Sequence, residues 1–162
     1  MKFELRELSA ADISSAAEIE KLCFSSPWSE STLLSELQNP LNKFYGAFFE
    51  NTLAGYIGFQ TVVDETSVFN VAVAPEFRRN GIGKALVEKM ISEAKGAGAN
   101  VIFLEVRAGN LPAINLYEKE GFVFFGLRKN YYENPTENAF IYRLAFDGSQ
   151  ESEDPIECWD EE

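Results

Sequence analysis

The sequence contains no histidine, which narrows the chemistry that its 162 residues can perform. A serine or cysteine nucleophile activated by imidazole is excluded, and so are most zinc sites, because histidine is usually the base or a ligand in them. The two cysteines, Cys23 and Cys158, have neither a CxxC nor a metal-ligand spacing and are expected to be free thiols in a reducing cytoplasm. No metal site is predicted, so acid–base chemistry must come from carboxylates, tyrosines, lysines or water.

Long apolar runs and a surplus of basic residues are also missing. No run approaches the roughly 18–20 apolar residues of a membrane span, and the N-terminal segment MKFELREL alternates like a first strand instead of a signal peptide. The chain has 14 basic and 26 acidic residues and a formal net charge of −12, which argues against general nucleic-acid binding. Neither a membrane nor a nucleic acid is therefore an expected partner.

The end of the chain differs in composition from the rest. Residues 147–162 contain eight of the acidic residues and no lysine or arginine. Low hydrophobicity with a high charge of one sign is typical of a segment that does not fold on its own. We therefore expect one domain over residues 1–146 and a largely mobile acidic tail over residues 147–162, in which Pro155, Ile156 and Trp159 are still suited to docking.

The residue pattern before the tail predicts an α/β domain. Alternation and short apolar runs predict seven strands, at residues 3–8, 43–50, 53–63, 67–74, 101–106, 122–127 and 138–146. Capping residues and apolar positions three and four apart predict four helices, from Ser9 to about Leu22, from Ser29 to about Asn39, from the glycines after Arg78 to Gly96, and from Asn110 to Gly121. This order indicates a mixed central sheet with one right-handed β–α–β crossover in the middle.

The segment RRNGIGKA, Arg78 to Ala85, lies between a predicted strand and a predicted helix. It is not a P-loop, because that motif requires glycine at the position of Arg78 and serine or threonine at the position of Ala85. It is not a dinucleotide-binding fingerprint either, because Leu86 occupies the position of the third glycine. Glycines permit close backbone approach, and the unpaired N–H groups and the dipole at a helix start attract anions. The pattern therefore favours a phosphate site, and the alternative is a glycine-rich connector with solvated basic side chains.

A second motif, LEVRAGNLPAINLYEKEGF, follows at Leu104–Phe122. Together with the pattern Arg78-x-x-Gly81-x-Gly83, it resembles the GNAT family of acetyl-CoA-dependent N-acetyltransferases, and the features that carry the resemblance are Asn110, Ala113-Ile114, Tyr117 and Gly121-Phe122. The order of predicted elements is similar to the GNAT fold from Phe3 to Phe146. The resemblance implies a sheet that is splayed between the strands at residues 67–74 and 101–106.

The same resemblance implies that acetyl-CoA is the co-substrate. In this family the loop before the helix holds the pyrophosphate, and the residues at that place are Arg78, Arg79, Asn80, Gly81, Ile82, Gly83 and Lys84. The pantetheine arm lies in the splayed gap, which implies backbone contacts from Val71, Ala72 and Val73 and a further contact from Asn110. The alternative for residues 71–73 is an ordinary core strand.

Further segments are similar to the RimI type of GNAT enzyme, which acetylates the N-terminal alanine of small-subunit ribosomal protein eighteen. They are FSSPWS, FNVAVAPEFRRNGIGKAL, LEVRAGN and RKNYY. This resemblance implies a basic protein N-terminus as the acceptor, Glu105 as general base and Tyr117 as general acid. A carboxylate can take a proton from an amine, directly or through water, and a phenol of pKa about 10 can protonate a thiolate whose thiol has a pKa of about 8.5. The alternatives are a buried acid paired with Arg107 or Arg128, and a core tyrosine.

The identity of the acceptor rests on fewer residues. Candidates for a peptide-binding rim are Pro27, Trp28, Tyr131 and Tyr132, and the alternative for them is simple aromatic packing. The acidic tail either attracts a basic acceptor or only keeps the protein soluble. Two other functions stay open, namely a GNAT enzyme that acetylates a small amine such as a polyamine or aminoglycoside, and a non-catalytic module that senses acyl-CoA.

Overall fold

The computed structural model describes residues 2–146 and 156–160. The predicted order of strands and helices is confirmed, with two short 3-10 turns and one more strand in addition. The elements are β1 (Glu4–Glu7), η1 (Ala10–Asp12), α1 (Ile13–Cys23), α2 (Glu30–Gln38), β2 (Asn42–Phe49), β3 (Thr52–Val62), β4 (Glu65–Val73), η2 (Pro75–Phe77), α3 (Ile82–Gly96), β5 (Val101–Arg107), α4 (Leu111–Lys119), β6 (Val123–Tyr132), β7 (Glu137–Ala145) and β8 (Ile156–Asp160).

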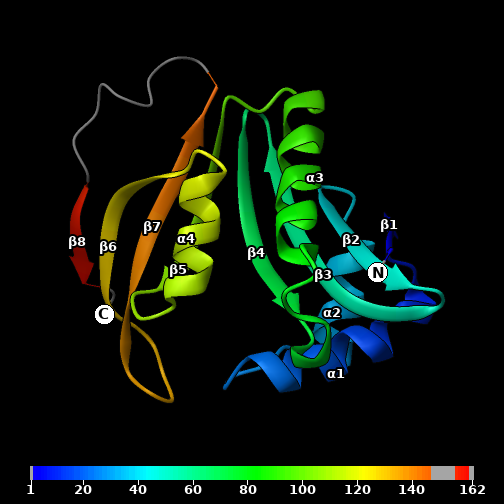
Figure 1. Cartoon of the computed structure of the whole chain (residues 1–162). Helices are drawn as coiled ribbons and strands as arrows, with labels where there is room; N and C mark the ends of the chain where they lie inside the picture. The colour runs from blue at the N-terminus through cyan, green and yellow to red at the C-terminus, as the bar shows by residue number, and fades with distance from the viewer. Residues whose placement is uncertain (1, 147–155, 161–162) are drawn as a thin grey trace.

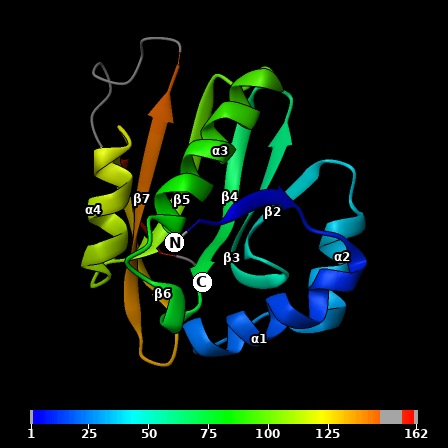
Figure 2. The ribbon, with the colours of Figure 1, turned by 45° about the vertical axis from the view of Figure 1, so that its right-hand side comes forward.

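The eight strands of the described residues form one mixed sheet in the order β1-β2-β3-β4-β5-β7-β6-β8. Neighbouring strands are antiparallel except for the pairs β4–β5 and β6–β8, which are parallel. Helices α3 and α4 cover one face of the sheet, as Figure 1 shows. Helices α1 and α2 cover the other face, which the turned view of Figure 2 brings out. The predicted α/β fold with its β–α–β crossover is therefore confirmed.

An apolar cluster on each face of the sheet explains why these helices form. Along α3, the buried side chains Ile82, Leu86, Met90 and Ala94 recur every four residues, as the sequence pattern predicts. The second predicted helix begins as expected, because the Oγ of Ser29 accepts a hydrogen bond from the backbone N–H of Thr32 at 3.2 Å. None of the helices in residues 2–146 is long and apolar enough to cross a membrane.

Strands β4 and β5 pair over only three residues each. The pairing joins Glu65–Ser67 of β4 to Val101–Phe103 of β5, beside a backbone hydrogen bond of 2.7 Å from Asn100 N to Asp64 O. Beyond this point the two strands diverge, toward the lower part of Figure 1. Strand β5 pairs instead with β7 along its whole length. The predicted splay of the sheet is therefore present, and it leaves one edge of β4 without a strand partner.

Strand β6 is longer than predicted, because it continues through residues 128–132. Asn130 has a φ of 51°, in the left-handed region, and the register of β6 against β7 shifts between Arg128 and Tyr132. Such an irregularity interrupts the alternation of side chains and so hides a strand in the sequence. Arg128, Tyr131 and Tyr132 consequently lie on a strand of the sheet.

Most of the predicted acidic tail, residues 147–155 and 161–162, lies outside the described residues. Residues Ile156–Asp160 form β8, which runs parallel to β6 with Gly126 opposite Ile156 and Lys129 opposite Asp160. This strand belongs to the sheet, and it contains Ile156 and Trp159, two of the residues that the sequence analysis named as suited to docking. The boundary of the domain near residue 146 stays a prediction.

Candidate active site

A cavity of about 790 Å³ occupies the gap between β4 and β5. It is lined from both faces of the sheet, by Tyr117 of α4 on one face and by Glu20 of α1 and Trp28 of the α1–α2 loop on the other. Because β4 and β5 do not pair at this level, the cavity passes through the sheet. Such a passage allows two substrates to enter from opposite faces and to meet between the strands.

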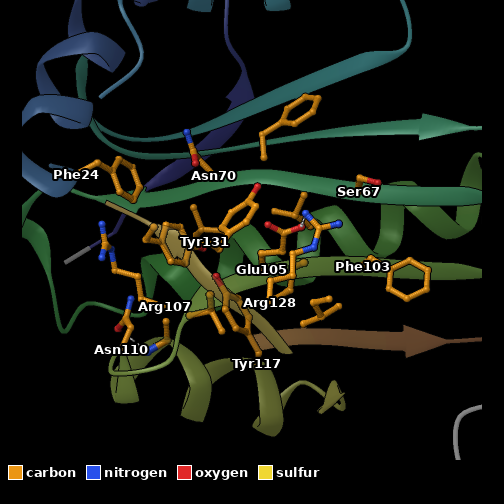
Figure 3. A pocket seen from close by; sticks show the side chains of 18 of the residues that line it. Phe24, Ser67, Asn70, Phe103, Glu105, Arg107, Asn110, Tyr117, Arg128 and Tyr131 are labelled. Atoms are coloured by element: carbon orange, nitrogen blue, oxygen red, sulfur yellow. Dashed lines mark hydrogen bonds and ion pairs between the residues drawn. The ribbon is translucent and has the colours of Figure 1, made fainter. Parts of the chain in front are cut away.

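Glu105 lies on β5 and lines this cavity. Its neighbours Leu104 and Val106 are buried in the apolar cluster beneath α3 and α4, so the alternation of the strand directs Glu105 to the opposite face. Its Oε1 lies 3.2 Å from an Nη of Arg128 on β6, and Figure 3 shows the two side chains side by side. The ion pair that the sequence left open is therefore formed, and it holds the Glu105 carboxylate in the cavity wall.

Tyr117 lies on α4 and approaches the cavity from the other face. The side chain is buried, with its ring centroid 5.9 Å from that of Phe122. Burial raises the pKa of Tyr117 to about 12. A phenol with this pKa keeps its proton at neutral pH, so Tyr117 is present in the protonated form that a proton donor requires. Glu105 and Tyr117, both predicted as catalytic, are thus brought to one cavity.

Three of the four residues predicted for the peptide-binding rim, Trp28, Tyr131 and Tyr132, line the cavity, and Pro27 does not. The rings of Tyr131 and Tyr132 meet edge to face, with centroids 5.1 Å apart. Burial and the negative charge of Glu105 raise the pKa of Tyr132. Both the functional and the structural interpretation are consistent with this arrangement, because the two tyrosines contact each other and, like Trp28, also line the cavity.

Arg107 joins the parts of this rim. Its guanidinium lies 4.5 Å from the ring centroid of Tyr132 and donates hydrogen bonds to the backbone oxygen of Glu133 at 2.8 Å and to Ser25 Oγ at 3.2 Å. It also lies 3.3 Å from the carboxylate of Glu137. One side chain of β5 therefore fixes both the α1–α2 loop and the β6–β7 turn, a role that the sequence analysis did not predict.

The predicted pyrophosphate loop, Arg78–Lys84, lies outside this cavity at the start of α3. The first hydrogen bond of the helix runs from Ala85 N to Gly81 O at 3.1 Å, so the N–H groups before Ala85 have no carbonyl partner within the helix. Gly81 has a φ of 77°, in the left-handed region that favours glycine. The loop therefore presents unpaired backbone donors at the positive end of the α3 dipole, as an anion site requires.

Of the three β4 residues predicted to contact the pantetheine arm, two turn their backbone toward the gap between β4 and β5. Ala74 N donates to a carbonyl of β3 at 2.8 Å, so the alternation turns the backbone of Ala72 toward β3 and the backbones of Val71 and Val73 toward the gap. The carbonyl of Val73 accepts a hydrogen bond of 3.1 Å from Nε of Arg78. The edge is thus open at Val71 and engaged by the protein itself at the Val73 carbonyl.

Two further residues predicted to bind the co-substrate, Asn80 and Asn110, form hydrogen bonds with nearby backbone groups. Asn80 Nδ2 donates to the carbonyl of Phe77 at 2.9 Å, which holds the shape of the loop. Asn110 lines the cavity, and its Oδ1 accepts a hydrogen bond of 3.3 Å from Ala113 N as the N-cap of α4. Among the described residues, no group of three or more histidine, cysteine, aspartate or glutamate side chains is placed to hold a metal ion.

Two polar residues of the cavity, Glu20 and Asn70, were missed by the sequence analysis. Glu20 lies on the buried face of α1, four residues after the fully buried Ala16, so an acid on an apolar helix face was the available signal. Asn70 interrupts an otherwise apolar strand, which is a weaker signal. They contact each other in the structure, with Asn70 Nδ2 2.7 Å from Glu20 Oε1.

Known proteins resemble this chain in sequence and in structure. The model of the acetyltransferase (GNAT) family matches residues 13–122. A ribosomal protein bS18-alanine N-acetyltransferase of Salmonella typhimurium is 40% identical over 140 residues, covering 85% of this chain and 93% of that protein. The crystal structure of the ribosomal-protein-S18-alanine N-acetyltransferase from Escherichia coli superimposes with a TM-score of 0.84 at 34% identity, covering 94% of this chain and 99% of that one.

A more distant structure shares the fold alone. The PaiA N-acetyltransferase from Thermoplasma acidophilum, crystallised in complex with coenzyme A, has a TM-score of 0.75 at 23% identity over 90% of this chain and 99% of that one. The family match covers more than half of the present sequence, and the relatives named above are similar over nearly their whole length. The chain therefore belongs to the acetyltransferase (GNAT) family.

Proposed function

We propose that the protein transfers the acetyl group of acetyl-CoA to the N-terminal α-amine of a protein, and that the acceptor is the N-terminal alanine of ribosomal protein bS18. The observation that carries the proposal is the cavity through the sheet, which brings Glu105 and Tyr117 to one place. The names of the relatives from Salmonella typhimurium and Escherichia coli support this choice of acceptor.

Acetyl-CoA fits the face of the sheet that carries α3 and α4. The unpaired N–H groups at the start of α3 would hold the pyrophosphate, with Arg79 and Lys84 adding positive charge. The open backbone of Val71 on β4 would contact the pantetheine amides. Gly81 leaves free space at this end, since a side chain placed there would meet nothing within 4 Å. The co-substrate supplies a thioester, and the protein supplies its position and its proton transfers.

The acceptor then approaches from the opposite face, past the aromatic residues Trp28, Tyr131 and Tyr132. Its α-ammonium group must lose a proton before it attacks the thioester carbonyl, and Glu105 is a carboxylate of the cavity wall that, unlike Glu20, is only partly buried. Because Glu105 is already paired with Arg128, an arriving cation competes with that guanidinium for the carboxylate. The C–S bond breaks as the amide forms, and the leaving thiolate takes a proton from the hydroxyl of Tyr117.

Replacing Tyr117 by phenylalanine is expected to lower kcat by about 10²-fold, in the usual range for a positioned acid, while coenzyme A affinity stays within a few-fold. The pKa of about 12 sets the pH dependence, because a group whose pKa is raised keeps its proton up to that pH. The wild-type kcat should therefore show no decline between about pH 7 and 10 that belongs to Tyr117. A decline in that range that disappears in Tyr117→Phe would show that the phenol loses its proton earlier and contradict this assignment.

Acetylation of N-terminal alanine peptides is expected to exceed that of internal lysines or polyamines. An α-amine has a pKa near 7.7–8 and a lysine one near 10.4, so at about pH 7.2 roughly a fifth of α-amines but only about one lysine in a thousand are neutral. A modest base is therefore sufficient for an N-terminus. The measurement is acetyl transfer to peptides that differ only in their first residues. Equal or higher kcat/KM on polyamines would favour the small-amine alternative, and absence of transfer to any amine would favour the non-catalytic one.

A further inference from the structure

A buried carboxylate that the proposed mechanism does not use lies in the wall of the cavity. The side chain of Glu20 on α1 is fully buried. Its Oε1 accepts hydrogen bonds of 2.7 Å from the hydroxyl of Tyr56 and of 2.7 Å from Nδ2 of Asn70. Its Oε2 is buried and has no hydrogen-bond partner within the described part of the chain. An acid with one oxygen unpaired is costly to bury, so it is expected to serve something more than packing.

Glu20 determines which way the amide of Asn70 points. An amide has one donating and one accepting end, and the Oε1 of Glu20 accepts when the carboxyl is ionised and also when a proton sits on the unpartnered Oε2. Asn70 must therefore direct its NH2 group toward Glu20, and its Oδ1 is turned away. Burial raises the pKa of Glu20, and Tyr56 and Asn70 oppose this shift by their hydrogen bonds. With the carboxyl ionised, or protonated on Oε2, the orientation of the Asn70 amide is the same.

The free oxygen of Asn70 belongs to the acceptor side of the cavity. Asn70 lines the cavity and is only partly buried, and within residues 2–146 its Oδ1 accepts no hydrogen bond. Ala72 of β4 and Ala74, just after that strand, pack in the cluster beneath α1 and α2, and Asn70 is in phase with them. Glu105 on β5 faces the same side, and Figure 3 shows the two residues on strands that bound the cavity. The Asn70 carbonyl and the candidate base therefore face one space.

We propose that Asn70 Oδ1 accepts a hydrogen bond from the acceptor chain, and that Glu20 is the positioning residue that holds this oxygen toward the cavity. The inference rests on the proposed function. In the proposed mechanism the α-amine of the acceptor gives its proton to Glu105. The next hydrogen-bond donor along the acceptor chain is the amide N–H of its second residue. Asn70 thus recognises a peptide backbone, which a polyamine lacks, and it distinguishes a protein N-terminus from a small amine without reading its side chains.

The test combines Asn70→Leu, which removes the oxygen at similar volume, with an acceptor peptide that is N-methylated at its second residue. In Asn70→Leu, KM for the unmodified peptide should rise about three- to tenfold, the usual worth of one hydrogen bond, with kcat and coenzyme A affinity within about twofold. The wild type should lose a similar factor on the methylated peptide, and Asn70→Leu should lose little more, because the two changes remove the same contact. Glu20→Leu should behave like Asn70→Leu, whereas Glu20→Gln keeps an accepting oxygen and should restore KM to near the wild-type value.

Two outcomes contradict the inference alone. One is an unchanged KM in a folded Asn70→Leu, and the other is a methylation penalty of equal size in the wild type and the variant. If Asn70→Leu does not fold by circular dichroism, Asn70→Ala is used in the same comparison. Failure of the wild type to acetylate the unmodified peptide contradicts the proposed function itself, so the two failures are distinguishable.

Discussion

Glu105→Gln is expected to lower kcat for an N-terminal alanine peptide by about 10²-fold or more, the usual contribution of a positioned base. Glutamine keeps the size of the side chain but cannot take a proton from the α-ammonium group. Glu105 lies on the face of the sheet opposite α3, so coenzyme A affinity should barely change. The residual rate should keep rising with pH, because the fraction of peptide that is already neutral grows up to the pKa of the α-amine.

The matched control for this change is Glu18→Gln, which removes an exposed carboxylate of α1 whose contact is Lys21. It should leave kcat unchanged. Glu105→Gln removes the ion pair with Arg128, so thermal unfolding must be recorded for both variants. A near-normal kcat at about pH 7 in Glu105→Gln would overturn the base assignment, and deprotonation would then run through another group or through water alone.

Gly83→Asp is expected to weaken coenzyme A binding by about 10²-fold. Gly83 lies in the first turn of α3, where the unpaired N–H groups would contact the pyrophosphate. A carboxylate within about 5 Å of a phosphate costs about 3 kcal/mol at an effective dielectric constant near 20. The new side chain would also meet Leu116, whose side chain lies 3.2 Å from the position of the added Cβ. Calorimetric titration with coenzyme A measures the loss directly.

Two further glycine variants show whether the loss of affinity comes from the added charge, from the added volume or from a general loss of stability. Gly83→Ala adds the same Cβ without charge and meets only the flexible end of Leu116, so affinity should fall only a few-fold. Gly96→Asp makes the same chemical change at the other end of α3, where an added Cβ would meet nothing within 4 Å, and should leave affinity unchanged. Unchanged coenzyme A affinity in a folded Gly83→Asp variant would contradict the proposal that the pyrophosphate binds at the start of α3.

The order of elements was predictable because it depends on local signals. Apolar spacing along α3 and the N-cap Ser29 act within a few residues, and both are present in the structure. The splay between β4 and β5 is a property of long-range pairing, and it came only from the resemblance to the GNAT family. The irregularity at Asn130 works against the local signals, so residues 128–132 were not predicted as part of β6.

The candidate site was predictable where a motif carries it and not where a tertiary contact creates it. Glu105 and Tyr117 stand in the motif and reach one cavity. The contact between Glu20 and Asn70 joins residues 50 positions apart, on a helix and a strand that face each other only in the folded chain. Arg107 was considered only as an ion-pair partner, because the loop and turn that it ties together are likewise distant in sequence.

Because β4 and β5 pair over only three residues each, a small rotation at this pairing displaces the far end of β4 relative to β5. Val73 lies six residues beyond the last paired residue, Ser67, which at about 3.3 Å per residue is a distance of about 20 Å. A rotation of about 3° at the pairing moves β4 at that distance by about 1 Å, and a misplacement of that size can change a rate by about 10²-fold. In the proposed mechanism, the alignment of thioester and amine would therefore depend on the stiffness of this three-residue pairing, which lines one end of the cavity. Thr66 lies in that pairing, fully buried, with its hydroxyl 2.8 Å from that of Thr61.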